Sequence, residues 1–221
     1  MAGERNLAAA SGGGIDWTCP SEGERRGLKR ATYEDVLNAP ENKVAEILDG
    51  ELFLSPRLSP RHSVASSRLG GALVPFDDGQ EGTPGGWWIL FEPELHFGGD
   101  VVVPDLGGWR RQRMPAIPDT AFFSLAPDWV CEVLSPSTER IDRGRKLRIY
   151  AGAGVAHAWF VNPVERTLEV LRLRDGAWTI VTVCSGSDTV RVEPFDAIEL
   201  ALGRLWVESP TSPDPLREAL E

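Results

Sequence analysis

The chain has 221 residues, of which 42% are hydrophobic and 25% are charged, and its formal net charge at pH 7 is −10. This composition is ordinary for a globular protein, and the length suits one domain with a single sizeable core. The negative charge excludes a protein that coats nucleic acid by bulk electrostatics, although it leaves room for a local basic site. No apolar run reaches the roughly 18 residues needed to span a bilayer, and the first residues lack the pattern of a signal peptide.

The three cysteines, Cys19, Cys131 and Cys184, are widely spaced and form neither a disulfide framework nor a zinc pattern. Cys131 lies in an apolar run, which predicts a buried thiol, and we expect a protein of the reducing cytoplasm. Residues 1–28 are rich in Gly, Ala and Ser and predict a disordered leader. Residues 209–221 predict a mobile, Pro-rich acidic tail, so the folded domain is expected at 29–208.

The first predicted elements are a short helix and a hairpin. Thr32 is a candidate N-cap with Asp35 three residues later, as in a capping box. Lys43–Leu48 and the strand after it flank Asp49-Gly50, a dipeptide typical of a tight hairpin turn. Glu46 projects to the same face as its apolar neighbours on this strand, which predicts a semi-buried acid.

The remaining elements alternate between helices and strands. A helix is predicted over 59–76, a strand over 87–91 that 94–97 continues or pairs with, and a second helix over 137–153. A strand over 156–161 and a hairpin turning at Asp175-Gly176 follow. This order predicts an α+β (mixed α/β) fold with a central mixed sheet flanked by helices, an N-terminal hairpin and a C-terminal hairpin.

Two apolar runs are each accompanied by one acidic residue: Asp105 follows Val101–Pro104, and Glu132 lies within Trp129–Leu134. A carboxylate in such a run is costly to bury unless positive charge meets it. The next helix supplies that charge, because residues 139–148 carry five cationic and two acidic side chains. Two carboxylates on neighbouring strands, with the carbonyl oxygen of Val133, predict an Mg²⁺ site that Mn²⁺ can also fill. Lys146 is the candidate to orient a water bound there.

Several motifs of the chain match one protein family in order and spacing. They are Glu46–Leu52, Ser59-Pro60 with His62, Val103–Asp105, Glu132–Thr138, Asp142-Arg143 with Lys146, and Tyr150-Ala151 leading to Gly154-Val155 and Trp159. With them the chain resembles the Uma-type restriction endonucleases, a branch of the PD-(D/E)XK nuclease superfamily, over about residues 30–205. The resemblance implies a restriction-endonuclease-like core and Mg²⁺-dependent hydrolysis of phosphodiester bonds, with DNA as the expected substrate. It also implies a homodimer or higher homo-oligomer and makes Glu46 an accessory acid near the metal.

One position departs from the superfamily pattern. The second acid is usually followed two residues later by lysine, and here that position is Leu134. Lys146 on the following helix fits as the displaced lysine, because the amine has to reach a point in space and not a point in sequence.

Six arginines are candidates for contacts with nucleic acid. They are Arg110, Arg111, Arg140, Arg143, Arg145 and Arg148. The first two follow Trp109, and the three residues together suggest a segment that stacks on a nucleic acid and clamps it. The helical arginines also fit a merely solvated face, which is the usual role of a charge run.

Plainer interpretations stay open for the acids. Asp105 also suits the cap of a turn, and Glu132 suits a structural ion pair with Lys146 or Arg143. The alternative function is therefore a catalytically inactive nuclease fold that binds nucleic acid or protein.

Overall fold

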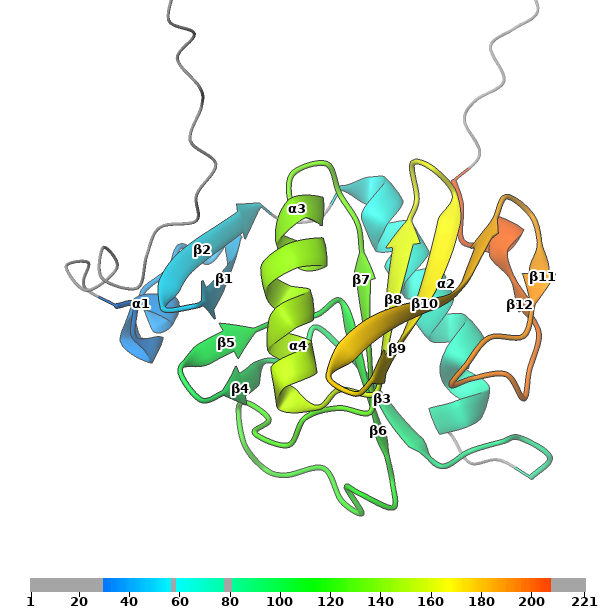
Figure 1. The fold of residues 1–221 in the computed structure, drawn as a ribbon, viewed down its shortest axis with the longest axis horizontal. Helices are drawn as coiled ribbons and strands as arrows, with labels where there is room; N and C mark the ends of the chain where they lie inside the picture. Colours follow the sequence, from blue (N-terminus) through cyan, green and yellow to red (C-terminus); the bar gives the residue numbers. More distant parts are fainter. Residues whose placement is uncertain (1–29, 57–58, 78–80, 208–221) are drawn as a thin grey trace, which may run out of the picture. The chain divides into compact units, whose positions relative to one another are not determined.

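The computed structural model describes residues 30–56, 59–77 and 81–207 of the chain (Figure 1). The predicted leader at 1–28 and tail at 209–221 lie outside these ranges, so both stay predictions. Within the described ranges, no helix is both long and apolar enough to cross a membrane.

A six-stranded sheet forms the centre of the fold and has the order β10-β9-β8-β7-β6-β3. Its strands are β3 (Trp87–Phe91), β6 (Leu106–Arg110), β7 (Trp129–Val133), β8 (His157–Asn162), β9 (Thr167–Arg174) and β10 (Ala177–Ser185). The β7–β8 pair is parallel and the other pairs are antiparallel, which confirms the predicted mixed sheet.

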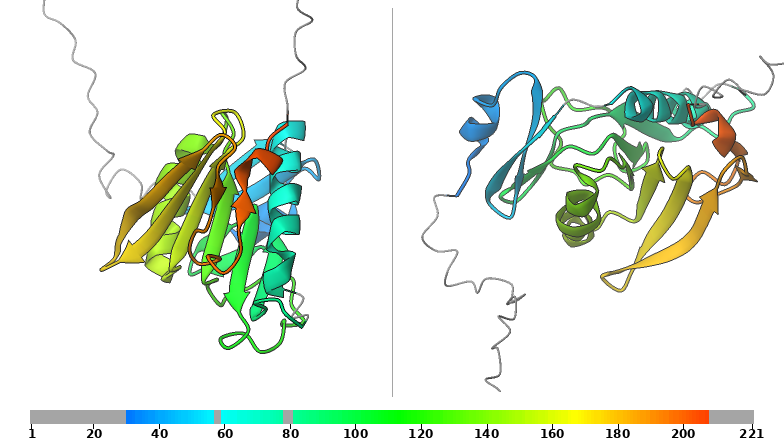
Figure 2. Two further views of the ribbon diagram at one scale, coloured as in Figure 1. Left: turned by 90° about the vertical axis from the view of Figure 1, so that its right-hand side faces the viewer. Right: turned by 90° about the horizontal axis from the view of Figure 1, so that it is seen from above.

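Helices cover both faces of this sheet, as the two rotated views show (Figure 2). One face packs against α2 (Pro60–Asp77) and the other against α4 (Leu147–Ala153). Side chains alternate along β7, so Trp129, Cys131 and Val133 face α2 while Val130 faces α4. The thiol of Cys131 is buried, as predicted.

The predicted N-terminal hairpin is part of a second sheet. β1 (Lys43–Leu48) and β2 (Glu51–Pro56) join β5 (Asp100–Val102) and β4 (Leu95–Phe97) in the order β2-β1-β5-β4. Asp49 and Gly50 both have positive φ, as a tight primed turn requires, which confirms the predicted hairpin. The short helix α1 (Tyr33–Leu37) precedes it and has the predicted capping box.

Two expectations about the strands and helices need correction. Leu95–Phe97 neither continues nor pairs with β3, because Glu92 takes a positive φ before Pro93 and the chain turns into the other sheet. The helix predicted over 137–153 is also irregular. It begins as α3 (Glu139–Ile141), widens into a π-helical turn (Asp142–Lys146) and ends as α4.

The C-terminal part of the described chain closes one edge of the core. The hairpin β9–β10 turns at Asp175-Gly176, as predicted. A two-stranded sheet of β11 (Thr189–Val190) and β12 (Leu200–Ala201) follows, with a 3₁₀ turn at Leu202–Arg204. Phe195 between them packs against Trp87, Trp129 and Trp159.

Candidate active site

The register of β6 and β7 brings the two predicted acids together. Leu106 pairs with Cys131 in this antiparallel ladder, so Asp105 comes opposite Glu132. The carboxylate oxygen Oδ2 of Asp105 accepts the backbone N–H of Val133 at 2.6 Å. Glu132 points to the α4 side of the sheet, because its neighbours Cys131 and Val133 point to the α2 side.

Lys146 lies in a cage of oxygens. Its Nζ is 2.9 Å from Glu132 Oε1, 3.1 Å from Glu46 Oε1 and 3.7 Å from Asp142 Oδ1, and it donates to the carbonyl of Val103 at 3.0 Å. Only 3% of Lys146 is exposed. The lysine on the helix therefore reaches the acids on the strands, at the place where the sequence predicted it.

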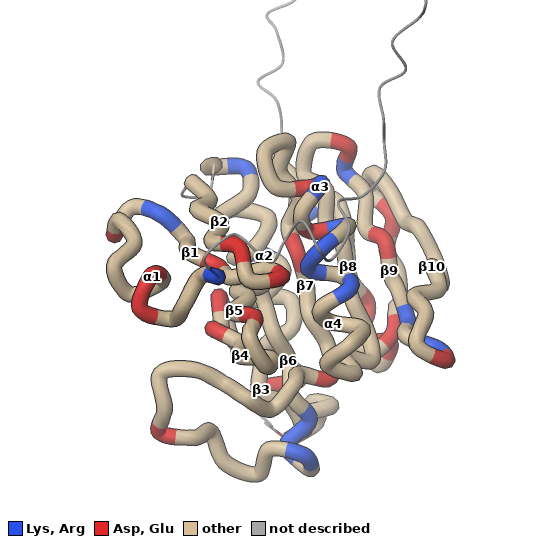
Figure 3. The backbone as a smooth tube through the Cα atoms, turned by 60° about the vertical axis from the view of Figure 1, so that its left-hand side comes forward, with Lys and Arg blue, Asp and Glu red and all other residues tan. Residues whose placement is uncertain are grey.

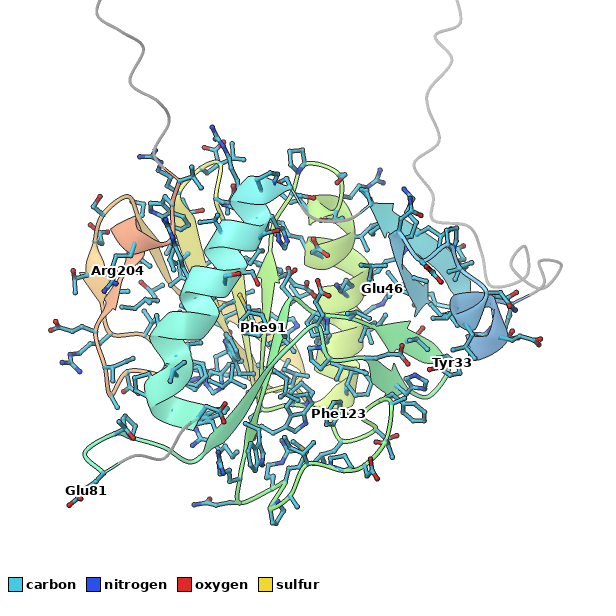
Figure 4. The ribbon with its side chains drawn as sticks, turned by 180° about the vertical axis from the view of Figure 1, so that it is seen from behind. Tyr33, Glu46, Glu81, Phe91, Phe123 and Arg204 are labelled. Carbon is cyan, nitrogen blue, oxygen red and sulfur yellow. The ribbon has the colours of Figure 1, made fainter. Side chains whose placement is uncertain are left out.

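Two acids of the cage are fixed by a further hydrogen bond. Tyr150 donates its hydroxyl to Glu132 Oε1 at 2.6 Å, and the N–H of Val103 donates to Glu46 Oε1 at 2.8 Å. Figure 4 labels Glu46 between the β1–β2 hairpin and the α3–α4 helix. Glu46 is buried, slightly deeper than the semi-buried position predicted for it.

The π-helical turn belongs to this site. Asp142 and Lys146 form its two ends, and both are buried while Arg143 and Arg145 between them are not. A π turn is a rare feature that often occurs at functional sites. Here it lies in the stretch of helix that presents the amine to the sheet.

His62 is a residue of the site to which sequence reasoning gave no role. Its Nε2 lies 3.1 Å from Asp105 Oδ1, so α2 and β7 hold the two oxygens of one carboxylate. The signal was indirect: Ser59 caps α2 by accepting the N–H of His62, which places residue 62 in the first helical turn. A lone histidine has no pattern that would have assigned it to Asp105.

These side chains line one pocket of about 270 Å³. Its inner wall holds Glu46, His62, Asp105, Glu132, Asp142 and Lys146. Hydroxyl groups of Ser55, Ser59, Ser135, Ser137 and Thr138 line it as well, together with Glu92. The pocket therefore combines an acidic floor with neutral hydrogen-bonding groups.

Acidic side chains outnumber the one lysine in this pocket. Burial raises the pKa of Glu132 well above its ordinary value; Lys146 opposes the rise, and the nearby carboxylates add to it. Burial likewise raises the pKa of Asp142. Burial acts to lower the pKa of Lys146, but Glu132 and Glu46 outweigh it and raise that pKa well above its usual range. The lysine is therefore a cation, and the site favours further positive charge.

The donor set suits a hard divalent cation. Asp105 and Glu132 line the same pocket as Val133, and Mg²⁺ is typically held by one or two carboxylates together with waters and substrate phosphates. In the part of the chain that the structure describes, no group of three or more His, Cys, Asp or Glu side chains is placed to hold a metal. The residues therefore fit an ion that takes some of its ligands from the protein and the rest from water or substrate.

The arginines of the helix are mostly engaged by acids of the same chain. Arg143 pairs with Glu139 and Glu169, Arg145 with Glu51, and Arg148 with Asp49 at 2.5 Å. Figure 3 shows the resulting alternation of blue and red along the helix and its neighbours. Arg140 is exposed and makes no ion pair with the residues described. Contact of these arginines with nucleic acid stays a prediction.

Within the segment after Asp105, Trp109 is packed into the protein, whereas Arg110 is exposed. Trp109 is fully buried and donates its indole N–H to the carbonyl of Leu125, so it is not available to stack on a base. Arg111 lies over the ring of Trp88 and pairs with Asp77. The suggestion that Trp109 clamps a nucleic acid is wrong, because its ring completes the core.

Comparison with known proteins gives one family and one similar fold. The model of the Uma2 family, described as "Putative restriction endonuclease", matches residues 30–203. Among solved structures, the crystal structure of a "putative nuclease belonging to DUF820" from Anabaena variabilis has a TM-score of 0.64 and 23% sequence identity. It covers 79% of this chain and 97% of its own, and at this identity it shows the restriction-endonuclease-like fold. A search of curated proteins gave no match.

Proposed function

The chain belongs to the Uma2 restriction endonuclease family, and from this premise we propose that it is a Mg²⁺-dependent endonuclease that hydrolyses phosphodiester bonds in DNA. The observation that carries the proposal is the buried Lys146 beside Glu132 and Glu46, in the pocket that also holds Asp105. A nuclease function is what the family supports. The metal, the substrate and the roles of the residues are our proposal.

Asp105 and Glu132 would hold the cation, with the carbonyl oxygen of Val133 as a further donor. A bound Mg²⁺ lowers the pKa of a coordinated water and neutralises charge that develops on a phosphate; Mn²⁺ substitutes for it. Burial raises the pKa of Glu132 and the neighbouring carboxylates add to the rise, which supports the binding of a divalent cation that would offset both effects.

Lys146 acts as a hydrogen-bond donor and not as a base. Its raised pKa keeps the amine protonated, so it can orient the attacking water or stabilise an oxyanion but cannot accept the proton of the water. Glu46 holds the amine in place at 3.1 Å and assists as the accessory acid. The hydroxyl groups around the pocket supply neutral donors for a phosphate.

One observation favours a second candidate, the inactive nuclease fold. One oxygen of Glu132 is engaged within the chain, because Oε1 lies 2.9 Å from Lys146 Nζ and accepts from Tyr150. The predicted alternative of a structural pair with Lys146 is therefore present in the geometry, while Arg143 pairs elsewhere. Metal binding and cleavage distinguish the two functions.

We expect Asp105→Asn to abolish nicking of supercoiled plasmid, because it removes the charge that binds the cation. Wild type and variant are compared with Mg²⁺, with Mn²⁺ and with chelator, on plasmid, single-stranded DNA and RNA. Lys146→Met is expected to lower kcat by about 10²-fold or more. Equal trace activity in wild type and both variants would show contamination and favour the inactive fold.

Asp128→Asn is the matched control. Asp128 lies at the opposite end of β7, its side chain is 12% exposed against 11% for Asp105, and it also accepts a backbone N–H. We expect it to leave metal dependence and cleavage unchanged. Thermal unfolding of all variants shows which losses follow from a damaged fold.

The homodimer also belongs to the proposal, because cutting both strands of DNA commonly pairs two subunits. Sedimentation velocity over a range of concentrations tests it. A monomer at every concentration would restrict the enzyme to nicking or to single strands.

A further inference from the structure

We propose that His62 is a positioning residue that fixes the carboxylate of Asp105 for the cation. This inference rests on the proposed function and gives a role to a buried group that the mechanism above does not use. His62 is 3% exposed, lines the pocket and lies 3.1 Å from Asp105 through Nε2.

The second ring nitrogen shows which tautomer is present. Nδ1 of His62 is buried, and within the described residues it has no hydrogen-bond partner. A proton on Nδ1 would leave a buried N–H without an acceptor, which is destabilising. Nε2 faces Asp105 Oδ1 at 3.1 Å, so we assign the ring proton to Nε2.

Asp105 is thereby held by two donors from two elements. Nε2 of His62 on α2 lies 3.1 Å from Oδ1, and the N–H of Val133 on β7 donates to Oδ2. Each oxygen keeps lone-pair capacity for a cation, and the carboxylate cannot rotate without breaking both hydrogen bonds. His62 therefore acts on the metal through Asp105.

The ring is itself held in place by the start of α2. Pro60 is the first helical residue, and Ser59 accepts the backbone N–H of His62 at 3.4 Å. This cap fixes the first turn, and with it the direction from which the imidazole meets Asp105. Because hydrogen-bond partners behind a metal ligand orient it, their loss typically costs about 10–100-fold in metal affinity or activity.

The test measures Mn²⁺ affinity by titration calorimetry and cleavage in parallel. His62→Phe keeps the ring shape and removes the donor, and we expect about 10-fold weaker Mn²⁺ binding with a similar fall in kcat and little change in KM. His62→Gln, whose amide nitrogen can take the place of Nε2, should restore most of the affinity. In an Asp105→Asn background, His62→Phe should have no further effect.

His96→Phe is the matched control, because His96 makes a similar contact of 2.7 Å with Glu94 away from the pocket. If His62→Phe fails to fold, His62→Asn, whose short amide cannot reach Asp105, is compared with His62→Gln instead. Wild-type Mn²⁺ affinity in His62→Phe overturns this inference and leaves the proposed function standing. A wild type that neither binds Mn²⁺ nor cleaves overturns both.

Discussion

At the scale of single residues, the site is defined by an imbalance of charge. Glu46, Glu132 and Asp142 surround one amine, and Asp105 lies in the same pocket. Lys146 therefore stabilises the cluster only in part, and a carboxyl group in it gains from holding a proton when no cation is bound. This has a consequence for stability as a function of pH.

Glu132→Gln is expected to flatten the pH dependence of unfolding in the absence of divalent cations. The folded-state pKa of Glu132 is raised by burial, so from about pH 4.3 upward the folded state binds a proton that the unfolded state has lost. This contribution is present at low pH and is lost as pH rises through the folded-state pKa. In wild type this loss of stability amounts to about 1.4 kcal/mol per unit of pKa shift. Glu132→Gln has no carboxyl group to deprotonate at this position, so it should not show the loss.

The measurement is urea unfolding of wild type and variant at pH 5 and pH 8. Glu199→Gln serves as the control, since the side chain of Glu199 is 64% exposed and should not alter the slope. A wild type that loses no more stability than Glu132→Gln between the two pH values would contradict the charge imbalance.

The sequence predicted several residues that the structure brings into one pocket, and two of the acids stood out because they follow or interrupt an apolar run. Asp105 and Glu132 were visible in this way, and Lys146 followed from the cationic helix. His62 was not assigned, because its partner is 43 residues away and only the α2 cap brings them together. Ion pairs of the helical arginines with Asp49 and Glu51 were equally hidden, because they depend on the position of the hairpin.

At the scale of elements, turns were more predictable than packing. Asp-Gly fixed two hairpins through local backbone preference, whereas the π turn and the second sheet depend on contacts between distant segments. Gly70 shows the same difference: a Cβ there would come 2.1 Å from the Phe91 ring, so this glycine serves the packing of α2 on β3. Gly71 next to it faces open space.

Two glycines at the end of α4, two residues apart, should change stability in opposite directions when each is replaced by alanine. Gly152 lies within the helix and has free space where a Cβ would be, so Gly152→Ala should stabilise the protein by about 0.5–1 kcal/mol. Gly154 ends the helix with φ of 78°, which favours glycine, so Gly154→Ala should destabilise it by about 1 kcal/mol. Chemical denaturation measures both. The same sign for both variants would contradict this helix end.

At the scale of the whole molecule, the negative charge limits how nucleic acid is bound. The net charge is −10, the pocket floor is acidic, and most candidate arginines are paired within the chain. A nuclease with this distribution needs the cation to bring a phosphate to the site, and few counterions are released when it binds. The mixed sheet and the helices were predictable from element order, but this pairing of charges was not.

We therefore expect DNA binding with a shallow salt dependence. Each phosphate neutralised contributes about −0.9 to the slope of log K against log salt, and with few free arginines the slope per subunit should be about −1 to −3. Arg140→Ala should reduce the magnitude of this slope by about one unit. Arg140 is exposed and lies two residues after Thr138, which lines the pocket. Arg174 is an exposed arginine at the end of β9, and Arg174→Ala should leave the slope unchanged.

The measurement is fluorescence anisotropy of labelled DNA. The Asp105→Asn protein is used to avoid cleavage, and wild type with Ca²⁺ provides the cation-bound state. A slope near −8 would show that the paired arginines exchange their carboxylates for phosphates.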